Sequence, residues 1–173
     1  MSRIAAATFA ALTLCACAPV VAGGPPMALD PALRDQARLG TITMSSDWLM
    51  AEDDFSDTFT DEVGEELRRC MTGDRTLNLR LHVDDLDRAG RLETVVRGDG
   101  MHTLAATAEF VDPQTRQVVG RYPIRVATQA GGAVPALLGD RQMMVSEEYG
   151  RALCEEAFGR NPRRSGPWNA TRG

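Results

Sequence analysis

Lysine is missing from this chain of 173 residues, whose 19 basic side chains are all arginine. Acidic side chains outnumber them, and the formal net charge of −5 argues against nucleic acid as a partner, because binding a phosphate backbone needs excess positive charge. Aromatic residues make up only 5%, so the core has to rely on Leu, Val, Ala and Met. No apolar run reaches about 18 residues, so the sequence predicts no membrane-spanning helix.

Recognisable catalytic motifs are also missing. No Ser or Cys lies in a nucleophile-elbow pattern, and no glycine-rich loop could cradle a phosphate. Of the two histidines, His82 and His102, only His82 has acidic neighbours, Asp84 and Asp85. A metal site needs three or four converging ligands, and adjacent strand residues point to opposite faces, so a solvated polar face is the favoured interpretation. We therefore expect neither a cofactor nor enzymatic activity.

The N-terminus has the layout of a secretory signal. Arg3 precedes a short apolar segment, residues 4–14, that is too short to span a membrane. The segment ends in Leu14-Cys15-Ala16-Cys17, which resembles the lipobox of bacterial lipoproteins, with Leu at −3 and a small residue at −1. The resemblance implies that residues 1–16 are a signal peptide and that Cys17 is the lipidation site, carrying palmitate-type chains. The alternative is cleavage after Ala22, which would leave a soluble periplasmic protein.

Lipidation of Cys17 would hold the chain at a lipid bilayer, because burying acyl chains is worth ~0.8 kcal/mol per CH₂. Ala18 follows, and in the enterobacterial sorting rule that this resembles, a residue other than Asp leads to the outer membrane. The resemblance thus implies an outer-membrane lipoprotein that faces the periplasm. Residues 17–38 are predicted to be a flexible tether, and residues 161–173 a disordered tail, because both are rich in Pro and Gly.

Residues 39–160 are predicted to form one α+β domain. Alternating apolar residues indicate strands at 39–44 and 76–83 and a hairpin within 103–128, whereas helical spacing indicates helices at 56–72 and 140–159. We expect Ser56 to be the N-cap of the first helix and Gly73 its C′ residue. The order β-α-β-β-β-α predicts a four-stranded, mostly antiparallel sheet with two helices on one face and the first two strands parallel.

This order of elements resembles a loose group of small envelope lipoproteins. The group includes the core domain of the curli-secretion lipoprotein, activators of penicillin-binding proteins, and auxiliary lipoproteins of lipid-transport ABC systems. Residues 112–120 (DPQTRQVVG) resemble a hairpin that such proteins carry, which has Gly after the Thr where this chain has Arg116. The resemblance brings no catalytic residues with it.

Cys70 and Cys154 are the cysteines that remain once the signal peptide is removed and Cys17 is acylated. An even pair in the oxidising periplasm is a disulfide candidate. The predicted topology makes the two helices parallel, so their C-terminal ends, which carry these residues, lie at the same edge of the sheet. A disulfide is therefore predicted; the alternative is two separate buried thiols.

Three apolar residues after the first strand, Trp48, Leu49 and Met50, either cap the core or form an exposed lip that contacts a partner. We expect a non-enzymatic adaptor or accessory subunit of a cell-envelope machine, with an envelope protein as its partner. The alternative is a carrier that binds a lipid or another hydrophobic ligand between helices and sheet. Met50, Met143 and Met144 would suit such an adaptable pocket.

Overall fold

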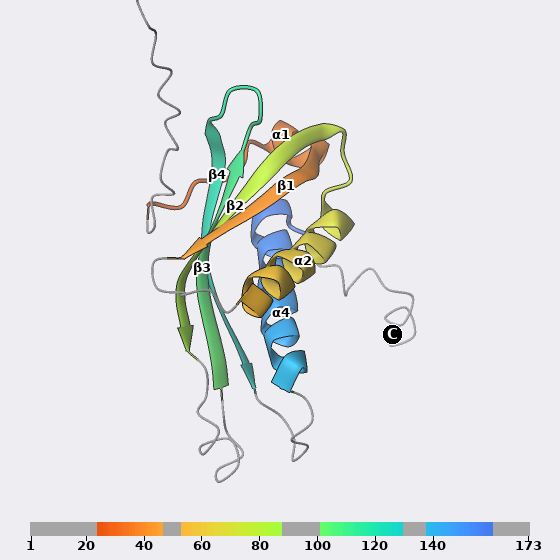
Figure 1. The fold of residues 1–173 in the computed structure, drawn as a ribbon. Helices are drawn as coiled ribbons and strands as arrows, with labels where there is room; N and C mark the ends of the chain where they lie inside the picture. The colour runs from red at the N-terminus through yellow and green to blue at the C-terminus, as the bar shows by residue number, and fades with distance from the viewer. Residues whose placement is uncertain (1–23, 47–52, 88–100, 130–137, 161–173) are drawn as a thin grey trace, which may run out of the picture.

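The computed structural model describes residues 24–46, 53–87, 101–129 and 138–160. Its helices α2 and α4 lie side by side on one face of a sheet, as Figure 1 shows, and the α+β class predicted from the sequence is confirmed. In chain order the elements are α1 (Pro31–Gln36), β1 (Ala37–Ser46), α2 (Asp53–Cys70), β2 (Arg75–Asp87), β3 (Met101–Val111), β4 (Val118–Gln129) and α4 (Leu138–Phe158).

The sheet has the order β1-β2-β3-β4. Strands β1 and β2 are parallel, as predicted, because α2 returns the chain to the same end of the sheet before β2 starts. The pairs β2–β3 and β3–β4 are antiparallel. One cross-strand row runs through all four strands on the face opposite the helices: Thr43, Arg80, Glu109 and Arg121.

The core lies between the helices and the inner face of the sheet. Alternate residues of β2 and β3 are fully buried there, and aromatic rings of the helices pack among them. Phe59 of α2 meets Tyr149 of α4 edge to face at 5.2 Å between ring centroids, and Phe158 meets Phe110 of β3 at 5.5 Å. The Tyr149 hydroxyl donates to the carbonyl oxygen of Ala106 at 3.0 Å, and its complete burial raises the pKa of the phenol. The helices are thereby joined to the sheet by a packed core and by this buried hydrogen bond.

The segment before β1 corrects the predicted tether, because part of residues 17–38 is folded onto the domain. The backbone N–H of Met27 donates to the carbonyl oxygen of Arg121 at 2.9 Å, and the N–H of Arg121 donates back to Met27 at 2.8 Å. Leu29 is buried, and its N–H donates to the Tyr122 hydroxyl at 2.8 Å. Asp30 then caps α1, whose first position is Pro31, the pairing that favours a helix start.

Two helix-end predictions are also corrected. Helix α2 begins at Asp53, so Ser56 lies inside it rather than at its N-cap. Gly73 is not a left-handed cap; it allows a close approach of two backbone segments. A Cβ at Gly73 would overlap the carbonyl group of Gln36, and the N–H of Gly73 donates to the carbonyl oxygen of Ala37 at 2.9 Å. Among the described glycines, Gly159 is the one with positive φ (64°), directly after α4.

The hairpin turn is organised by Asp112. Its Oδ1 accepts from the backbone N–H groups of Gln114 at 2.8 Å and Thr115 at 3.1 Å, and its Oδ2 accepts from Arg75 at 2.9 Å. The Arg75 hydrogen bond, followed by the two backbone donors, lowers the pKa of Asp112 from 3.8 to about 2. Arg116 has φ 59°, the left-handed region that favours glycine, at the position where the similar hairpins carry Gly.

Candidate functional site

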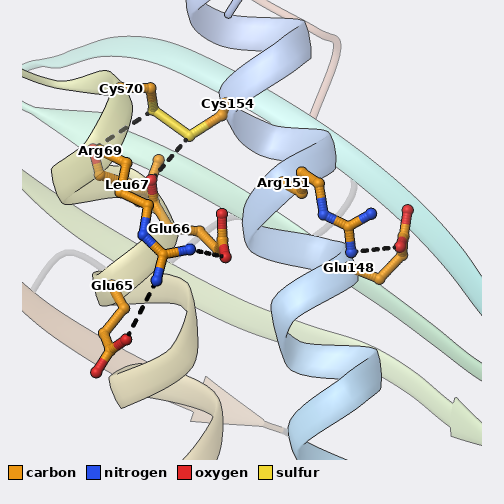
Figure 2. A network of polar contacts seen from close by, with 8 residues as sticks. All are labelled: Glu65, Glu66, Leu67, Arg69, Cys70, Glu148, Arg151 and Cys154. Carbon is orange, nitrogen blue, oxygen red and sulfur yellow. Dashed lines mark hydrogen bonds and ion pairs between the residues drawn. A yellow bond between two sulfur atoms is a disulfide. The ribbon is translucent and has the colours of Figure 1, made fainter. Parts of the chain in front are cut away.

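The predicted site residues fall into two sets. Cys70 and Cys154 form the expected disulfide between the C-terminal ends of α2 and α4, with a Cα–Cα distance of 6.0 Å (Figure 2). Arg160 also ties these ends together, because its Nη1 donates to the carbonyl oxygen of Cys70 at 2.5 Å. Cys17 and the predicted contact residues at 48–50 lie outside the described residues.

Close contact between the two helices depends on Gly150. A Cβ at this position would lie 2.9 Å from Cβ of Glu66 and 3.1 Å from Cα of Val63, so a larger residue would push α4 away from α2. The paired helices carry most of the acidic side chains of the domain. Burial, then the nearby charges of Glu147 and Glu65, raises the pKa of Glu62. The described residues contain no group of three His, Cys, Asp or Glu side chains placed to hold a metal ion.

The most organised polar group lies on the opposite, open face of the sheet. Glu109 of β3 is only 1% exposed, although the described helices α2 and α4 lie on the other face of the sheet. Its Oε1 accepts a hydrogen bond from Nε of Arg121 at 2.8 Å, and its Oε2 lies 2.9 Å from Nη2 of Arg80 in an ion pair. Both guanidinium groups therefore stand on neighbouring strands at fixed positions over one buried carboxylate. We refer to Arg80, Glu109 and Arg121 as the open-face triad.

A second polar line crosses the same face beside the open-face triad. Oγ of Ser45 lies 3.0 Å from Nδ1 of His82, Nε2 of His82 lies 3.9 Å from Oδ1 of Asp84, and the Thr107 hydroxyl donates to Oδ2 of Asp84 at 2.9 Å. The residue types are those of a serine hydrolase, but Ser45 donates to the carbonyl oxygen of Leu81 at 3.4 Å. When that bond forms, Nδ1 must donate to Ser45, which is the reverse of the general-base role. The line cross-links β1, β2 and β3.

The open-face triad was missed in the sequence analysis. Its signal was present, because Arg80 and Glu109 both fall at outward positions of their alternating strands. Bringing them together requires the register of β2 on β3 and of β3 on β4, which pairs Arg80 with Glu109 and Glu109 with Arg121. The alternating sequence pattern predicts on which face of the sheet a residue lies, but the strand register is needed to predict which residues are adjacent on that face.

Of the residues suggested for a lipid pocket, neither Met143 nor Met144 is fully buried between helices and sheet. Met144 is 49% exposed, Met143 is half-buried, and Met50 lies outside the described residues. Among the described residues, the side chains between the helices and the sheet form one buried hydrophobic cluster. Within the described part of the chain, no helix combines the length and apolar character needed to cross a membrane.

Comparison with known proteins gives similar folds and no family. No protein-family model and no curated protein matches the sequence. The structure is similar to a variant of the PelC dodecamer from Paraburkholderia phytofirmans, with 13% identity, coverage of 78% of this chain and 92% of that one, and a TM-score of 0.46. It is also similar to a DUF330 protein from Xanthomonas campestris, with 10% identity, coverage of 74% and 88%, and a TM-score of 0.48.

A minor lipoprotein from Acinetobacter baumannii is a third similar structure, with 12% identity, coverage of 70% of this chain and 91% of that one, and a TM-score of 0.38. Bacterial lipoproteins are thus among the solved structures that this fold is similar to. At these identities and TM-scores, the similarities assign neither a family nor an activity to the chain.

Proposed function

We propose that this chain is an outer-membrane lipoprotein, anchored through Cys17 and facing the periplasm, whose domain binds a protein partner as a non-enzymatic adaptor of a cell-envelope machine. The leader and its lipobox-like end support the anchor. The buried disulfide between Cys70 and Cys154 supports an oxidising compartment.

The observation that carries the adaptor role is the open-face triad. The carboxylate of Glu109 holds two guanidinium groups in place, and the side chains of Arg80 and Arg121 remain 24% and 18% exposed. Arginine is enriched in protein interfaces because its planar fork pairs with carboxylates, and prior ordering reduces the conformational entropy lost on binding. The triad therefore offers ordered, partly exposed guanidinium groups to acidic side chains of a partner.

Anchoring would make modest affinity sufficient. A partner confined to the same envelope meets the domain at high effective concentration, so a few charged contacts can maintain the complex. In this proposal the partner binds the open face of the sheet, which carries the open-face triad, and not the core between helices and sheet.

A photo-crosslinking experiment in cells tests the proposal. A photoreactive amino acid replaces Arg125, which is exposed on the open face of β4, or, as the matched control, Glu156, which is exposed on α4. We expect one discrete crosslinked protein from position 125 and none from position 156. The yield should fall in the Cys17→Ser variant, because loss of the anchor lowers the local concentration.

Two results would overturn the proposal. One is equal crosslinking from positions 125 and 156, or none from position 125, in protein whose Cys70–Cys154 disulfide is intact by mass spectrometry. The other is continued labelling of Cys17→Ser by a palmitate analogue, which would show that the anchor is assigned to the wrong residue.

A further inference from the structure

The two edges of the sheet differ in how they are protected against further strand pairing. On β4, Pro123 cannot donate to a ladder, two arginines add charge, and Met27 already bridges the edge at Arg121. On β1, residues 39–45 (LGTITMS) contain neither a charge nor a proline. Among the described residues, β1 pairs with β2 on one side, and its other bridge is a single one at Arg38, to Thr72.

The inner face of β1 is also incompletely covered. Leu39, Ile42 and Met44 lie opposite β2 residues Leu77, Leu79 and Leu81, which are fully buried. The three β1 residues themselves are only half-buried. An additional strand beside β1 would cover this apolar row and satisfy the edge backbone at the same time.

We propose that β1 pairs antiparallel with β1 of a second copy of the chain, about a two-fold axis at Thr43. In this register Ile42 of each copy faces Met44 of the other on the helix side, and Thr41 faces Ser45 on the open side. Thr43 faces itself, so no charged side chain is placed against its own copy. The two four-stranded sheets then form one continuous sheet.

The charges on the α2 surface next to β1 indicate that the strand pairing with β1 comes from a second copy of the chain. Asp57, Asp61, Gly64 and Arg68 share one side of α2 by helical spacing, and the two aspartates and the arginine are exposed. This side lies along β1, because a Cβ at Gly64 would be 3.0 Å from Cδ1 of Ile42 and 3.5 Å from Nη2 of Arg68.

A two-fold axis in the middle of β1 makes the α2 helices of the two copies antiparallel. The acidic half of this α2 side then faces the arginine-bearing half of the other copy, and Asp61 lies across from Arg68. A side that is acidic at one end and basic at the other is complementary to its own reverse. The uncharged residues 39–45 of β1 and the charged side of α2 thus point to the same symmetric partner.

Cysteine crosslinking of the full chain in cells tests the strand pairing. Facing Cα atoms in an antiparallel pair are about 4.5–5.5 Å apart, within disulfide range. Thr43→Cys should therefore give a product of twice the chain mass that disappears on reduction. Ala127→Cys, at a position that is also exposed but lies on β4, is the matched control and should remain a single chain. No dimer from Thr43→Cys, equal dimer from both variants, or a Thr43→Cys link only to another protein would overturn the proposal.

A charge swap tests the helix contact on the full chain in detergent by light scattering. Asp61→Arg and Arg68→Asp should each weaken dimerisation about threefold to tenfold, and the double variant should restore it to near the wild-type level. Glu156→Arg, the same charge change on α4, should leave it unaltered. A monomeric wild type, or a folded double variant that stays as weak as the single ones, would overturn the proposal.

Discussion

Replacing both Cys70 and Cys154 with Ala removes the covalent link between α2 and α4 and allows a precise stability prediction. The two cysteines are 84 residues apart, so the disulfide closes a long loop in the unfolded chain. In the chain-entropy model, a loop of this length is worth about 4.5 kcal/mol at 25 °C. Domains of this size are stable by only about 5–15 kcal/mol. We therefore expect the double variant to lose a large part of its free energy of unfolding.

Urea unfolding, followed by far-UV circular dichroism, measures the loss. Both proteins carry Cys17→Ser and a cleavable export signal, so that neither is lipidated. With an m-value of about 2 kcal/mol/M, the midpoint should fall by about 2 M urea in the double variant. The parent protein, when reduced, should shift by a similar amount, because both treatments open the same loop. A loss below about 1 kcal/mol, or a reduced parent as stable as the oxidised one, would refute the reasoning.

Three further predictions concern single residues. Arg116→Gly should stabilise the domain by about 1 kcal/mol in urea unfolding, because Arg116 has a left-handed φ that costs a residue with a Cβ; destabilisation would contradict this. The pKa of Asp112 is lowered from 3.8 to about 2, so its contribution to stability is complete above about pH 5 and is lost as the pH falls through about 2; Asp112→Asn should flatten the stability profile in that window. Glu109→Gln should cost about 1–3 kcal/mol, because it leaves two arginines without their shared carboxylate, and an unchanged midpoint would argue against the open-face triad.

The central architecture could be predicted because its signals are local. Period-two alternation marked β2 and the hairpin, and helical spacing marked α2 and α4. The disulfide needed one further step: a crossover between β1 and β2 makes them parallel, and this fixes the helix directions and brings Cys70 to Cys154. A local pattern together with a topological rule was sufficient for these features.

The remaining features depend on contacts between distant parts of the sequence. Leu29 lies at the end of a stretch rich in Pro and Gly, and its backbone N–H is bonded by Tyr122, 93 residues away. Glu109 is buried on the face that alternation assigned to solvent, because Arg80 and Arg121 cover it from neighbouring strands. Neither contact produces a periodic pattern in the sequence. The Pro and Gly content therefore predicted a tether at the first place, and the alternation predicted a solvated face at the second.

The Met27 bridge limits the distance between domain and membrane. If Cys17 carries the lipid, Met27, which is bonded to β4, is the tenth residue after the anchor, and a fully extended chain of that length spans roughly 35 Å. A tether that continued to residue 38 would have allowed roughly twice that reach. The β4 side of the domain would therefore stay within roughly 35 Å of the bilayer. A partner would have to meet it close to the membrane surface, not deep in the periplasm.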